Sequence, residues 1–152
     1  MNEPKYLFVE PGRDRRRRHE HLKHVLREPP GVDRARRLAV LVRELHDNRE
    51  INLALDAARR VLQESDGDVS LLVEVYTTHQ RPDLQIDDLS MLSSLGRWLQ
   101  HEPLCDAIRV RAYETALAWC RTVDGRERER RLDTLRRRFD DALADRVDLA
   151  LI

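Results

Sequence analysis

Several features that mark common classes of protein are missing from this sequence. No apolar run reaches the length of about 18 residues that a helix needs to cross a bilayer. The first twelve residues, MNEPKYLFVEPG, lack the basic start, the long apolar stretch and the small-residue cleavage site of a signal peptide. We therefore expect a cytoplasmic protein that has no membrane partner.

Cysteine, glycine and lysine are scarce. The two cysteines, Cys105 and Cys120, fall in one predicted helix, where a rise of 1.5 Å per residue separates them by about 22 Å. This separation is too large for a disulfide, so both thiols are expected to be reduced and buried. The five glycines are scattered, which excludes a glycine-rich phosphate loop. Only Lys5 and Lys23 are lysines, so 26 of the 28 basic residues are arginine, a bias that a GC-rich genome explains as well as function does.

Residues that could carry catalysis lack the arrangement that catalysis requires. Neither cysteine has a histidine in helical register, and the serines of residues 90–94 lie in a predicted helix rather than at a nucleophile elbow. The carboxylates of residues 83–88 are explained by helix caps and a solvated loop. The sequence therefore predicts no enzymatic activity, no cofactor and no small-molecule substrate.

The composition nevertheless indicates a folded protein. The chain has 152 residues, of which 41% are hydrophobic and 37% are charged, so a core and a dense ionic surface must coexist. A chain of this length is about one domain long. We predict a single helical domain over residues 1–152, with residues 1–12 as an extended N-terminal arm and residues 147–152 as an apolar C-terminal tail.

Apolar spacing and chain breakers divide the sequence into helices. The predicted helices span approximately residues 14–28, 33–45, 50–64, 68–80, 87–100, 103–123 and 126–146. The helix over 103–123 is apolar around much of its circumference and is expected to be the central buried helix. No segment shows the period-two alternation of a strand. The predicted fold is all-α, with about seven helices in antiparallel hairpins.

The helix pair of residues 35–68 has packing residues at regular positions. They are Leu38, Leu41, Val42 and Leu45 in the first helix and Ala54, Ala58 and Val61 in the second. This pair resembles a degenerate tetratricopeptide repeat, which is about 34 residues long. Residues 69–100 depart from the pattern because they lack the alanines. The resemblance implies a short stack of helical hairpins, and a closed helical bundle is the alternative.

Charge is sorted along a chain whose formal net charge is zero. Residues 66–106 hold two basic and eight acidic groups, whereas residues 107–138 hold ten basic and five acidic groups. Internal pairing, head-to-tail self-association, two separate partner surfaces and mixed solvated faces all explain this sorting.

Two arginine clusters are candidate contacts for phosphates or for an acidic partner. They comprise Arg13, Arg15, Arg16, Arg17 and Arg18, and, within residues 126–138, Arg136, Arg137 and Arg138. Nucleic-acid binding through these clusters is an alternative function. The neutral charge balance and the expected burial of Trp98 and Trp119 count against it.

Three histidines, at positions 19, 21 and 24, follow the first arginine cluster. His21 and His24 share a helix face, but His19 points elsewhere and the spacing differs from that of HExxH. The surrounding positive charge also repels cations. The sequence therefore predicts no metal site.

The function that these observations favour is a non-catalytic protein–protein interaction module, such as an adaptor, a chaperone-like protein or a regulatory protein. The partner is another protein or a second copy of the chain. Candidate apolar contacts are Leu149, Leu151 and Ile152, together with Tyr6, Leu7 and Phe8 if these residues lie outside the core.

Overall fold

The described part of the chain is helical throughout. The computed structural model describes residues 11–152 and the side chains of residues 14–152, and within that range it contains eight helices and no strand. The predicted all-α fold is therefore confirmed. Most of the predicted arm, including Tyr6, Leu7 and Phe8, lies outside the described residues.

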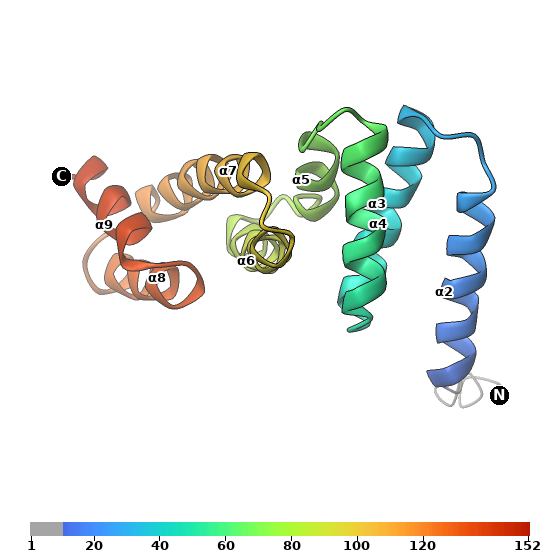
Figure 1. The fold of residues 1–152 in the computed structure, drawn as a ribbon. Helices are drawn as coiled ribbons and strands as arrows, with labels where there is room; N and C mark the ends of the chain where they lie inside the picture. The colour runs from blue at the N-terminus through green and yellow to red at the C-terminus, as the bar shows by residue number, and fades with distance from the viewer. Residues whose placement is uncertain (1–10) are drawn as a thin grey trace, which may run out of the picture. The chain divides into compact units, whose positions relative to one another are not determined.

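The helices fall into two compact units that divide after Asp68. The first unit contains α2 (Pro11–Leu26), α3 (Val32–Asp47) and α4 (Ile51–Glu64). The second contains α5 (Ser70–Tyr76), α6 (Pro82–Leu99), α7 (Glu102–Arg121), α8 (Gly125–Arg138) and α9 (Asp141–Ala150). Figure 1 shows these helices in chain order, and each unit is described by itself below.

The core of the first unit is the hairpin of α3 and α4. The buried stripe of α3 comprises Leu38, Leu41, Val42 and Leu45, as the spacing predicts, and it faces Ala54, Ala58 and Val61 of α4. The small alanine side chains let the two helix backbones approach closely. The turn between them places Arg49 at φ 62°, and the Glu50 N–H donates to the Leu45 carbonyl over 2.9 Å. The likeness of this hairpin to a tetratricopeptide repeat stays a prediction.

A buried arginine attaches the end of α2 to this hairpin. The Arg34 side chain donates from Nη1 to the carbonyls of Leu26 (3.0 Å) and Glu28 (2.9 Å), and from Nε and Nη2 to the carboxylate of Glu64 in α4. Carbonyls at a helix C-terminus have no partner within the helix, so this guanidinium supplies one. Arg34 is therefore a structural residue that connects α2, α3 and α4.

The second unit is organised around α7, which packs against α5, α6, α8 and α9. Its buried residues Ala112, Ala116 and Cys120 belong to one apolar cluster with residues of α6, α8 and α9. Helix α7 is thus central within this unit, as expected for residues 103–123, but it is buried on one side only, since Val110 is 60% exposed. Burial raises the pKa of the Cys120 thiol. Cys105 is only partly buried, so the prediction of two buried cysteines is wrong for Cys105.

A glycine sets the distance between α6 and α7. A Cβ atom placed on Gly96 would lie 3.3 Å from Cys105 Sγ and 3.4 Å from Ile108 Cδ1. These separations are tighter than most contacts of real Cβ atoms, so the two helices approach closely because residue 96 has no side chain.

The prediction of a single helix over residues 126–146 is wrong, because this segment forms two helices, α8 and α9. The chain leaves the helical conformation at Phe139 and is extended at Asp140, whose carboxylate accepts a hydrogen bond from the Leu143 N–H over 2.8 Å. Asp140 is therefore the N-cap of α9, and a cap at this position starts a new helix. The structure also differs from the predicted apolar tail of residues 147–152. This segment begins as the last turn of α9, and Val147 is buried.

Three other helix boundaries differ from the prediction. Helix α2 begins at Pro11 rather than after it, and α6 begins at Pro82, because proline fits the first turn of a helix. Helix α5 ends at Tyr76, so His79 lies beyond it, where its Nδ1 lies 2.6 Å from a carboxylate oxygen of the buried Asp88. Trp98 is half exposed, contrary to the expected burial.

Candidate interaction sites

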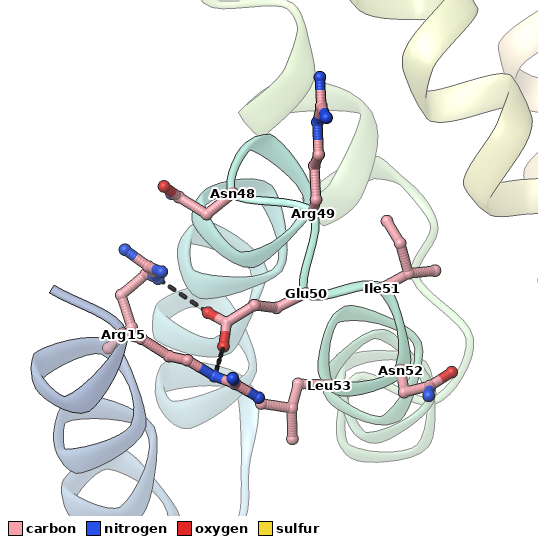
Figure 2. Close-up of a pocket in the computed structure, with 8 residues that line it drawn as sticks. Arg15, Asn48, Arg49, Glu50, Ile51, Asn52 and Leu53 are labelled. Atoms are coloured by element: carbon pink, nitrogen blue, oxygen red, sulfur yellow. Dashed lines mark hydrogen bonds and ion pairs between the residues drawn. The ribbon is translucent and has the colours of Figure 1, made fainter. Parts of the chain in front are cut away.

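In the first unit, Glu50 brings together three basic side chains of α2. Its carboxylate accepts hydrogen bonds from Arg15 Nε (3.1 Å) and Arg18 Nε (2.8 Å), and it lies 2.6 Å from His19 Nε2. Figure 2 shows Glu50 at the turn before α4, with its oxygens directed at α2. Only 9% of the Glu50 side chain is exposed. We call these four residues the Glu50 cluster.

Three members of the Glu50 cluster, Arg15, Arg18 and Glu50, help to line a pocket of about 540 Å³. Burial raises the pKa of Glu50, but hydrogen bonds from Arg18 and His19 and their positive charge lower it more, so the net pKa lies below the ordinary value of 4.5. The carboxylate is therefore ionised at neutral pH and acts as a counter-ion inside the protein. Two arginines predicted as phosphate contacts, Arg15 and Arg18, are bound to it.

The other residues of the arginine- and histidine-rich stretch form fewer contacts. Arg16 and Arg17 are exposed, and no carboxylate of residues 14–152 lies within ion-pair distance of either. The Arg13 side chain lies outside the described residues. His21 and His24 are exposed, and His19 faces Glu50 rather than the other histidines. In the part of the chain described, no group of three potential metal ligands is arranged to hold a metal ion.

The arginines of the second cluster are distributed among several partners. Arg136 contacts Asp133 (2.8 Å) and Asp145 (3.8 Å), and the hydrogen bond that it donates to Asp133 raises the pKa of Arg136. Arg138 pairs with Asp87 of α6 over 3.2 Å. Arg137 is exposed and donates to Thr134 over 3.3 Å. Internal pairing thus accounts for part of the charge sorting, because Asp87 belongs to the acidic segment of residues 66–106 and Arg138 to the basic segment of residues 107–138.

A cleft of about 260 Å³ opens in the second unit between α6, α7 and the start of α9. Its lining includes the apolar or small residues Ile108, Ala112, Phe139, Ala142 and Leu143, the residues Ser93, Cys105 and Asp140, and the arginines Arg97, Arg109 and Arg146. We call it the α9 cleft. Its lining is mostly apolar, and its charged groups are three arginines and one aspartate.

The arginines of the α9 cleft are held at its edge. The Arg146 guanidinium stacks on the Tyr113 ring, 4.5 Å from the ring centroid, and Arg97 donates to Ser94 Oγ over 3.3 Å. Arg109 pairs with Asp106 over 2.8 Å, but both side chains are largely exposed. Of the residues that the structure describes, no carboxylate lies within ion-pair distance of Arg97 or Arg146. These guanidiniums are therefore available to carboxylates of a binding partner.

The predicted apolar contacts lie at the end of α9. Leu149 is 69% exposed and Ile152 is 96% exposed, whereas Leu151 is partly buried against the core of the second unit. Asp141, Asp145 and Asp148 follow one another at helical spacing and are exposed. We call Asp141, Asp145, Asp148 and Leu149 the acidic face of α9.

Sequence reasoning missed the α9 cleft. Its arginines lie singly in three different helices, and each looks like an ordinary solvated residue in the sequence. The one local signal is the break at Phe139 and Asp140, because the new direction of α9 places Phe139 and Leu143 beside α7.

Comparison with protein-family models, with curated proteins and with solved structures finds no match for this chain. None of the described helices is both long enough and apolar enough to span a bilayer.

Proposed function

We propose that this protein is a non-catalytic interaction module that binds another protein through the α9 cleft. The observation that carries the proposal is the combination of an apolar floor, built by Ile108, Phe139 and Leu143, with arginines at the edge. In protein interfaces, a few residues supply most of the binding free energy, and they are typically bulky side chains that fill such pockets and arginines. The cleft lies between helices, which hold its lining in place.

The chemistry of the cleft supports binding rather than catalysis. Ser93 and Cys105 are its nucleophilic residues, and among the described residues no histidine or carboxylate hydrogen-bonds to either of them. An adjacent base is a common means of activating a serine or cysteine nucleophile, and the two residues lack it. The partner surface that fits this cleft has a bulky apolar side chain with carboxylates beside it.

Site-specific photo-crosslinking tests this proposal. A photoreactive amino acid replaces Ala142, which is exposed and lines the cleft, and the matched control replaces Glu129, which is exposed on α8 outside it. We expect a discrete protein adduct in the native host from position 142 alone, and we expect Arg97→Glu with Arg146→Glu to abolish it. Equal adducts from both positions, or none from position 142, would contradict the proposal.

Nucleic-acid binding is the second candidate, and Arg16, Arg17 and Arg137 favour it because they are exposed and have no carboxylate partner among the described residues. Binding would weaken steeply with salt and would be lost on replacing Arg16 and Arg17 by glutamine. Gel-shift measurements at low salt, with Arg59→Gln as the control for an exposed arginine elsewhere in the first unit, test this candidate.

A further inference from the structure

We propose that two copies of this chain associate, with Leu149 of one copy entering the α9 cleft of the other. This inference rests on the proposed function, because it uses the same cleft, and it names a second copy as the occupant. A partner for the cleft needs an exposed apolar side chain accompanied by carboxylates, and the acidic face of α9 has both.

The apolar part of the argument concerns Leu149. It is exposed on α9, whereas the other side of the helix is buried through Leu143, Ala144 and Val147. A leucine that leaves water for a pocket lined by Ile108 and Phe139 gains the hydrophobic stabilisation that its own unit does not provide.

The electrostatic part of the argument concerns the carboxylates around Leu149. Asp145 lies one helical turn before Leu149 on the same side of α9, so it accompanies Leu149 when that side approaches a surface, and Asp148 lies on the adjoining side of the helix. Asp145 contacts Arg136 at 3.8 Å, and Asp148 has no ion pair with any described residue. Arg97 and Arg146 at the cleft edge can supply the opposite charge, and charge-assisted pairs of arginine with carboxylate are among the stronger protein contacts.

The two surfaces are different patches of the same chain. If the contact is reciprocal, two copies close into a dimer in which both clefts are filled. The acidic face and the cleft edge have opposite charge, so association weakens as salt screens them.

Sedimentation velocity over a range of concentrations measures this association. We expect the 17.9 kDa chain to form a species of twice that mass, and Leu149→Gln to weaken the association about tenfold or more. The matched control is Val40→Gln, since Val40 is 58% exposed on α3 in the other unit, and it should leave the association unchanged. Circular dichroism checks that each variant keeps its helices.

Charge reversal makes the test specific for the two surfaces. One variant carries Arg97→Glu and Arg146→Glu in the cleft, and the other carries Asp145→Lys and Asp148→Lys on the acidic face. Each variant alone should be monomeric because like charges then meet, and an equimolar mixture should associate again because each cleft then faces the opposite charge.

Three results would overturn the inference: a wild-type chain that stays monomeric, undiminished association of Leu149→Gln, or folded charge-reversed variants that do not associate when mixed. The proposed function fails by a different result. A monomeric chain that still forms an adduct with a different protein from position 142 excludes self-association and leaves the proposed function intact. Association that survives Leu149→Gln, without any adduct from position 142, contradicts both.

Discussion

At the scale of single residues, Glu50 shows why an arginine-rich stretch is a poor guide to function. The sequence correctly places the stretch from Asp14 to His24 in a helix, and Val25, which follows this stretch, is buried. It does not predict that Arg15 and Arg18 are paired with Glu50. This partner lies more than thirty residues away in the sequence, and the turn between α3 and α4 brings it to them. Local spacing carries no information about such a contact.

The lowered pKa of Glu50 gives a prediction about acid. A carboxylate whose folded pKa is lowered stabilises the folded state above its unfolded pKa, and this contribution is lost as the pH falls through the folded pKa. We therefore expect the attachment of α2 to the hairpin of α3 and α4 to weaken once the pH falls below about 4.5, the ordinary value, and the contribution of Glu50 to be lost as the pH falls through its lower folded pKa. Arginine amide and side-chain NMR signals of α2 would report this weakening.

The variant Glu50→Gln reproduces the loss of the carboxylate at neutral pH. We expect faster trypsin cleavage after Arg16 and Arg17 in this variant, because α2 is then held by fewer contacts. The control is Glu20→Gln on α2 itself, where the carboxylate is exposed and, among the described side chains, pairs with Lys23 alone, at 3.8 Å. Equal cleavage rates for the two variants would show that the Glu50 cluster does not hold α2.

At the scale of helices, the sequence locates most elements and misplaces several of their ends. The stripes of α3 and α4 are regular enough to be predicted, because apolar spacing alone defines them. The break between α8 and α9 could not be predicted in this way, because the apolar residues continue at helical spacing across it, as Leu132, Leu135, Leu143 and Val147. Only the cap at Asp140, which competes with the continuing helix, separates the two.

The N-cap of α9 supports both the fold and the α9 cleft, and it can be tested by substitution. We expect Asp140→Ala to destabilise the protein by about 1 kcal/mol, because the Leu143 N–H loses its acceptor. Asp140→Asn keeps an acceptor of similar capping strength and should cost much less. Urea unfolding followed by circular dichroism measures both, and equal losses for alanine and asparagine would exclude capping as the role of Asp140.

At the scale of the whole molecule, composition and the absence of period-two patterns are enough to predict an all-α protein. They do not predict how the helices group, since grouping depends on which buried faces meet. The single domain expected from the chain length remains a prediction, and the structure describes two compact units, each with its own buried core.

The positions of the tryptophans allow this grouping to be tested. Both Trp98 and Trp119 belong to the second unit, so their fluorescence reports on that unit alone. Leu38→Ala removes a fully buried side chain from the first unit and should cost about 2–5 kcal/mol there. We expect the thermal midpoint from circular dichroism to fall while the fluorescence midpoint stays unchanged. A common shift would instead establish one cooperative domain.

The close approach of α6 and α7 at Gly96 has a consequence for specificity. The atoms nearest to a side chain at this position belong to Cys105 and Ile108, and both residues line the α9 cleft. A methyl group at residue 96 would press against Cys105 and Ile108 and so displace two residues of the cleft lining. Under the function proposed above, a substitution in the core can therefore change which apolar side chain the cleft accepts, although none of the residues that line the cleft is replaced.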